Sequence, residues 1–296
     1  MQQSDIFHDL VIFGAEIKGI SKPFLVGNLA MYPAYDIRKA LAGFDDGTIL
    51  AAARCGAIFS KYRESVHSHT AFSSLHIEDL ALLPFRLYRP GWILAAPVGA
   101  GLADLLPKVY KSLYMPSEKS VYPPGKFLIQ EDDIPKIRVV YEKLSYVPDG
   151  YLESPMERFS HSYNYIVERN LSNCLADLTS VFESVVSREG DSNLRMMYLR
   201  TALLIGNSLY DRIEIQKRLK SLYEVRRTIG DRHGTPEEYY QSFLVVEDTQ
   251  NLARAVLTAV VSILGVPPSE RSSFIPETME QVIDNYLFQS LHRDPR

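Results

Sequence analysis

Two arginines and a histidine lie close together in the C-terminal half of the sequence. Arg226 and Arg227 are adjacent, and His233 follows Arg226 by seven positions. A guanidinium stays charged and binds phosphate through paired hydrogen bonds, whereas an imidazole exchanges a proton near neutrality. These residue types suit chemistry on a phosphodiester.

The residues before the arginine pair follow a helical pattern from Arg212 to Arg226. Ile215, Leu219 and Leu222 recur at helical spacing, and Arg226 continues their stripe. We therefore predict that Arg226 lies on the apolar face, where a guanidinium needs a carboxylate, a phosphate or a partner chain. We expect the partner chain of a homodimer to meet this face.

Arg227 is expected on a different face, about 100° further round the helix. It lines up with Lys220 and Tyr223, which predicts a basic, exposed line. Gly230 and Asp231 favour a helix end, so His233 is expected at or just past it, free to approach Arg226.

A structural interpretation of the same residues stays open. Arginines near a helix C-terminus also stabilise the helix dipole, and structural ion pairs resemble sites. Glu183 lies inside an apolar helical stretch, and we expect it to pair with Arg200 or Arg226, because a buried acid needs a cation.

The pattern over residues 155–265 resembles the HEPN superfamily, and within it the Apea-like HEPN group. The resemblance is carried by an arginine-bearing apolar helix, a second helix ending in Leu-Tyr-x-x-Arg, a following His-Gly, an upstream apolar helix with an acid, and a closing helix. These correspond to residues 198–206, 211–227, 233–234, 175–186 and 247–264.

The resemblance implies metal-independent RNA cleavage by a homodimer without a cofactor. In HEPN ribonucleases an Arg-x(4–6)-His motif from each subunit meets across a helical interface and forms one composite site. Carried over by position, Arg226 with His233 gives Arg-x6-His, and Arg227 with His233 gives Arg-x5-His. The closest family members have a shorter spacing.

RNA cleavage needs few groups, because the 2′-hydroxyl of RNA can attack the neighbouring phosphorus. The site must supply a proton acceptor or donor and fixed positive charge. We assign catalysis to Arg226, Arg227 and His233, and RNA binding to Lys220, Tyr223 and Arg232. Residues 195–233 contain nine basic and four acidic side chains in a chain of net charge −4, which indicates a polyanion-binding surface or a solvated basic face.

The sequence predicts an α+β protein of two domains. Residues 1–150 combine strand signals, at 10–13, 48–59 and 80–87, with a helix from Asp132, and form a mixed domain that we interpret as a sensor or specificity module. Residues 151–296 are interpreted as an all-α, HEPN-like bundle, with helices expected at about 157–188, 192–206, 211–229, 237–264 and 277–291.

The remaining composition indicates a cytoplasmic protein. The two cysteines, Cys55 and Cys174, lie far apart and are expected to be reduced thiols, no secretory signal opens the chain, and no apolar run is long enough for a membrane. His67 and His69 form an His-x-His pair, but we expect no metal site there, because no cysteine or acidic set completes it.

Two classes of function remain from the sequence. The first is a HEPN-type endoribonuclease, a hydrolase of prokaryotic antiviral or stress defence, in which a toxin-like activity answers a protein trigger or an antitoxin. The second is a catalytically inactive HEPN protein that binds RNA or a protein partner, with the widened motif marking lost activity.

Overall fold

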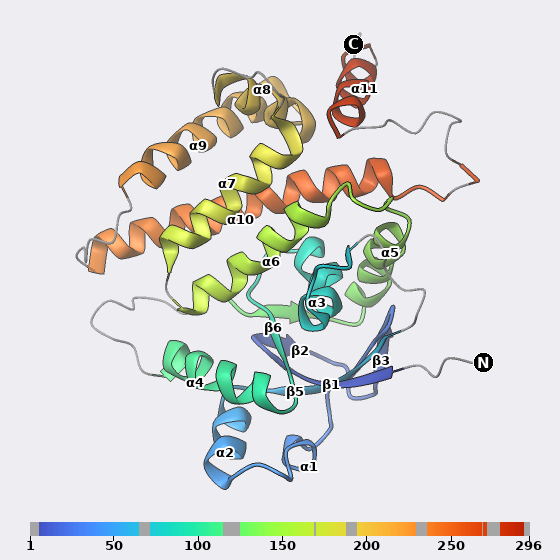
Figure 1. Cartoon of the computed structure of the whole chain (residues 1–296), viewed down its shortest axis with the longest axis vertical. Coiled ribbons are helices and arrows are strands. Elements are labelled where there is room, and N and C mark those ends of the chain that lie inside the picture. The colour runs from blue at the N-terminus through green and yellow to red at the C-terminus, as the bar shows by residue number, and fades with distance from the viewer. Residues whose placement is uncertain are drawn as a thin grey trace.

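The computed structural model describes residues 6–64, 72–114, 125–168, 170–187, 194–228, 236–267, 269–270 and 279–292. A strand-containing part lies at one end of the molecule, and helices make up the other (Figure 1). The predicted α+β class is confirmed.

The N-terminal part is built around a five-stranded antiparallel sheet. Its strand order is β3-β4-β5-β1-β6. The strands are β1 (Ile6–Phe13), β3 (Phe24–Val26), β4 (Leu29–Tyr32), β5 (Ile58–Glu64) and β6 (Leu94–Pro97). Two further strands, β2 (Ala15–Ile17) and β7 (Phe127–Ile129), pair in parallel beside it.

Both faces of strand β1, which lies between β5 and β6, are covered. Leu10 and Ile12 lie in one buried cluster, whereas Val11 and Phe13 lie in another, as the alternation of strand side chains requires. Helices α3 (Ile77–Tyr88) and α5 (Asp133–Ser145) contribute to the first cluster, and α2 (Asp46–Arg54) and α4 (Ala100–Tyr114) to the second. The short helix α1 (Ile37–Ala40) precedes α2.

Two strand predictions in this half are wrong. Residues 80–87 lie in helix α3, which contains Pro84. Most of this helix is buried, so its apolar residues form a continuous run and not the one-sided stripe by which a helix is predicted. Within 48–59, helix α2 occupies the first part and only the end belongs to β5. The predicted strand at 10–13 and the helix beginning near Asp132 are confirmed.

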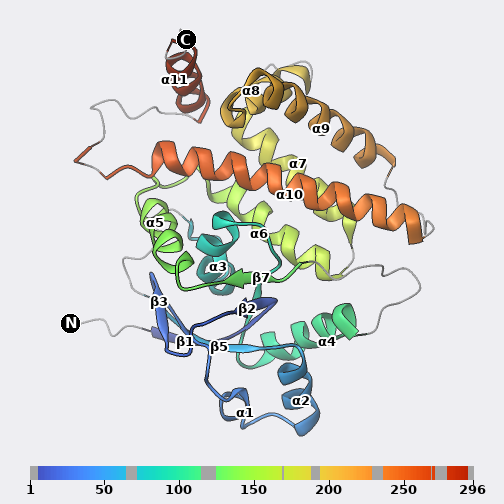
Figure 2. The ribbon, with the colours of Figure 1, turned by 180° about the vertical axis from the view of Figure 1, so that it is seen from behind.

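Every named element after residue 150 in the described part of the chain is a helix. These are α6 (Glu153–Glu168), α7 (Leu171–Val186), α8 (Leu194–Ile205), α9 (Leu209–Thr228), α10 (Pro236–Leu264) and α11 (Met279–His292). The predicted helices are confirmed, except that the stretch 157–188 consists of two helices instead of one. Seen from behind, α10 runs across the whole helical layer (Figure 2).

The two halves of the chain share one buried core across the predicted boundary at residue 150. Arg86 on α3 is 1% exposed, donates to Asp79 over 2.7 Å, and lies 4.5 Å from the ring centroid of Tyr163. Arg254 on α10 donates to the backbone oxygen of Arg86 over 2.6 Å and to the hydroxyl of Tyr163 over 3.1 Å. The division into two domains stays a prediction, and these contacts bind the halves together.

Among the described helices, none combines the length and the apolar character that crossing a bilayer requires.

Candidate functional site

Helix α9 presents the predicted apolar stripe to the protein interior. Ile215, Leu219 and Leu222 are 7%, 0% and 1% exposed. They belong to the core that α9 shares with α7, α8 and α10. The stripe is therefore confirmed, but its partners are helices of the same chain.

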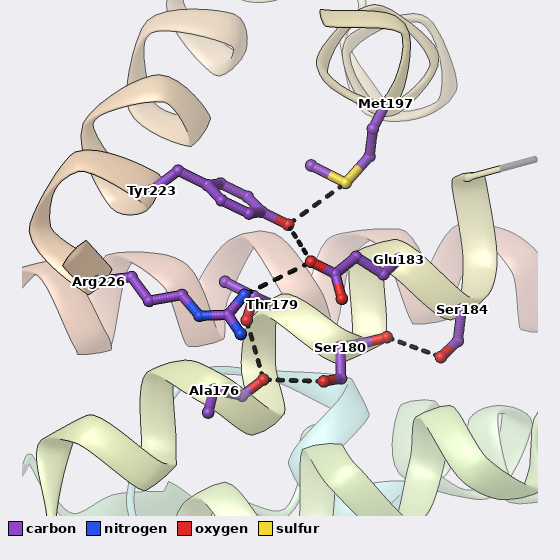
Figure 3. A network of polar contacts seen from close by, with 8 residues as sticks. All are labelled: Ala176, Thr179, Ser180, Glu183, Ser184, Met197, Tyr223 and Arg226. Carbon is purple, nitrogen blue, oxygen red and sulfur yellow. Dashed lines mark hydrogen bonds and ion pairs between the residues drawn. The ribbon is translucent and has the colours of Figure 1, made fainter. Parts of the chain in front are cut away.

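Arg226 meets the carboxylate of Glu183 on α7 (Figure 3). Its Nη1 lies 3.4 Å from Glu183 Oε1, and its side chain remains 38% exposed. The predicted pairing of Glu183 with Arg226 is confirmed. Among the described residues this hydrogen bond uses one of the five guanidinium N–H groups of Arg226.

Of the three partners expected for Arg226, the described residues supply the carboxylate. Glu183 of the same chain neutralises it, and the apolar stripe beside it is already covered. A homodimer interface at this face stays a prediction.

Tyr223 is buried, at 7% exposure, and does not lie on the exposed line where we placed it. Helix α8 covers it, since its ring packs 5.7 Å from that of Tyr198 and its hydroxyl lies 3.5 Å from the sulfur of Met197. The hydroxyl donates to Glu183 over 3.0 Å. Burial, and then the charge of Glu183, raise the pKa of Tyr223 well above its usual value, so it remains a donor. It thus holds Glu183 instead of stacking on a base.

Lys220 and Arg227 are exposed, as predicted. The Nζ of Lys220 lies 4.0 Å from Oε1 of Glu224, one turn further along the exposed side of α9. Arg227 lies close enough to Tyr198 for its charge to oppose the rise in the pKa of that phenol, although burial dominates and raises it. The predicted exposure of these two side chains is confirmed, and their contact with RNA stays a prediction.

Several of the nine basic residues counted between 195 and 233 make contacts within the protein. Arg200 is buried and donates to the backbone oxygen of Val186 over 3.0 Å, and Arg212 donates to that of Gly206 over 3.1 Å. Arg218 forms a two-point ion pair with Asp248 on α10. The exposed basic surface is therefore smaller than the residue count indicates.

His233 and Arg232 lie outside the described residues, and so do His67 and His69. The structure accordingly places Arg226, Arg227, Lys220 and Tyr223 on one helix end and does not place the predicted histidine.

A second cluster, which the sequence interpretation missed, lies between α6 and α7. Arg158 Nη1 donates to Asp177 Oδ1 over 2.9 Å, and His161 Nδ1 lies 3.7 Å from Asp177 Oδ2. The available signals were the Arg-x-x-His spacing, which puts two side chains on one side of a helix, and an aspartate inside an apolar helix.

Comparison of the chain with protein-family models, with curated proteins and with solved structures finds no match.

Proposed function

We propose that the chain is a metal-independent endoribonuclease of the HEPN type. The observation that carries the proposal is the Arg226 guanidinium, anchored by Glu183 yet more than one-third exposed, with the exposed Arg227 beside it. Two fixed charges at a helix end suit a phosphate and its neighbour along an RNA strand.

In this proposal Arg226 holds the scissile phosphate and stabilises the negative charge that develops on it. His233 takes the proton from the 2′-hydroxyl as the O2′–P bond forms. The P–O5′ bond breaks, and the leaving oxygen takes a proton from water or from a second imidazole. The products are a 2′,3′-cyclic phosphate and a free 5′-hydroxyl.

The proposal includes the assembly and context that the resemblance implies. The chain works as a cytoplasmic homodimer in prokaryotic antiviral or stress defence, and residues 1–150 act as the sensor or specificity module. The buried Arg86 and Arg254 network offers a rigid connection between this module and α10.

A second candidate is a catalytically inactive HEPN protein that binds RNA or a protein partner. The observation that favours it is the ion pair itself, because Glu183 neutralises the charge that catalysis would use. Such a protein would retain Arg226 for stability alone.

Incubation of purified protein with assorted RNAs in EDTA, beside a His233→Ala variant, tests the proposal. We expect wild-type protein to cleave and the folded variant to be inactive. Equal cleavage by both would refute the role of His233, and no cleavage by either, with RNA still bound, would favour the second candidate.

A further inference from the structure

Two basic side chains of α6 converge on one buried carboxylate of α7. Arg158 and His161 are three residues apart on one helix and therefore point to the same side. The Asp177 side chain between them is 8% exposed, whereas those of Arg158 and His161 are 50% and 33% exposed. The Asp177 carboxylate is therefore buried, whereas the guanidinium of Arg158 and the imidazole of His161 reach solvent.

The carboxylate of Asp177 is only partly satisfied. Oδ1 accepts from Arg158, but Oδ2 is buried and has no hydrogen-bond partner among the described residues. Buried polar atoms without partners are rare and costly. His161 Nδ1 faces Oδ2 at 3.7 Å, which is too long for a hydrogen bond but within reach of a small ring rotation.

His161 is the donor placed to satisfy Asp177 Oδ2, and the exposed ends of Arg158 and His161 are then the parts of the cluster that face an anion. In its imidazolium form His161 has two N–H donors, so Nδ1–H can close onto Asp177 while Nε2–H donates to a ligand. Arg158 keeps further N–H groups beyond the one that Asp177 accepts. The guanidinium of Arg158 and the imidazolium of His161, side by side, can each donate to an oxygen of one phosphate.

The anchors of the cluster and of Arg226, Asp177 and Glu183, both lie on α7, about 120° apart around the helix. Asp177 and Glu183 are six residues apart, or about 9 Å along the helix axis, which is the rise of two to three stacked nucleotides. Between them lies the half-buried Ser180, and the exposed Ser184 follows Glu183; the hydroxyls of both serines donate back to their own helix (Figure 3).

We propose that Arg158 and His161, oriented by Asp177, bind a backbone phosphate of the same RNA strand whose scissile phosphate is held by Arg226. This inference rests on the proposed function. It assigns α6 and the exposed side of α7 to substrate binding, with Asp177 as a positioning residue and no role for the cluster in bond breaking.

The direct test measures RNA binding by fluorescence anisotropy at several salt concentrations. Arg158→Gln should weaken the binding of a labelled single-stranded RNA roughly fivefold or more and make the salt slope shallower by about one unit.

Lys108→Gln is the matched control. Lys108 also contributes an exposed positive charge next to α6, through its 2.6 Å contact with Glu168, but it lies outside the cluster. It should bind RNA within about twofold of the wild type, because an exposed ion pair contributes little. Equal behaviour of Arg158→Gln and Lys108→Gln would overturn the inference.

A second measurement follows the His161 ring signal by NMR, assigned with His161→Gln, during titration with inorganic phosphate. We expect the signal to move in the wild type and to stay still in Arg158→Gln. If the signal moves in the wild type but Arg158→Gln binds RNA as tightly as the wild type, the cluster is an anion site that does not bind RNA, which also overturns the inference.

The two proposals fail separately. If the wild type binds RNA without cleaving it, the ribonuclease proposal is refuted, and the binding of RNA by Arg158→Gln still decides whether the cluster is an RNA-binding site. A wild type that binds no RNA refutes both.

Discussion

The hydroxyl of Tyr223 donates to Oε1 of Glu183 over 3.0 Å, and the same oxygen lies 3.4 Å from Nη1 of Arg226. Tyr223 is buried, whereas Glu183 and Arg226 are partly exposed. The buried hydroxyl of Tyr223 thus fixes the position of the Glu183 carboxylate. That carboxylate in turn orients the guanidinium of Arg226, to which we assign the scissile phosphate.

Tyr223→Phe should loosen Arg226 while it keeps the packing of the ring. We expect the single-turnover cleavage rate to fall roughly fivefold, which corresponds to about 1 kcal/mol, with little change in RNA affinity. Tyr198→Phe is the control, because its ring packs on Tyr223 but does not reach Glu183 through any described hydrogen bond. An equal effect of both substitutions would show that general packing, and not the hydrogen bond, matters.

Asp79→Ala should strongly destabilise the protein, because it leaves the buried Arg86 without its carboxylate. Loss of one partner of a buried pair typically costs about 3–5 kcal/mol, and Asp79→Ala/Arg86→Leu should recover part of that loss. Urea unfolding followed through the single tryptophan, the buried Trp92, measures the change.

Asp9→Ala is the control for that measurement, since Asp9 and Lys61 form an exposed pair at 3.5 Å. It should cost less than about 1 kcal/mol. If Asp79→Ala were equally mild, the contact between α3 and α10 would not depend on the ion pair.

The sequence was sufficient to predict the helices of the C-terminal half, because their amphipathic periods are long. It failed for α3 and most of α2. In α3 the side chains of Leu82, Leu83, Phe85 and Leu87 are all buried, so the segment has the continuous apolar character of a buried strand.

In the candidate site, the pairing of Glu183 with Arg226 was predicted on the premise that Glu183 is a buried acid; the pairing is confirmed, but the Glu183 side chain is 43% exposed. The burial of Tyr223 could not be predicted, since the helical positions of α9 do not reveal that α8 covers a second side of it. The Arg-x-x-His spacing and the aspartate inside an apolar helix were visible in the sequence, but their meeting in the Asp177 cluster was not, because it depends on how α6 and α7 pack together.

The proposed composite site requires the chain to sediment as a homodimer at micromolar concentration, with an isologous interface near Arg226. Leu209 and Tyr210 are 73% and 76% exposed but lie about 25 Å along α9 from Arg226. Leu209→Ser should therefore leave the dimer intact. A monomer with full activity would refute the composite site.

The most direct test of the account compares Arg226→Ala with Arg227→Ala in single-turnover cleavage and salt-dependent binding, both in EDTA. We predict that Arg226→Ala lowers the rate at saturating RNA on the order of 100-fold or more with an unchanged salt slope. Arg227→Ala should keep the rate, weaken binding, and make the slope shallower by about one unit. An Arg226→Ala variant that cleaves RNA as fast as the wild type, or the reverse assignment of the two effects, would contradict the account.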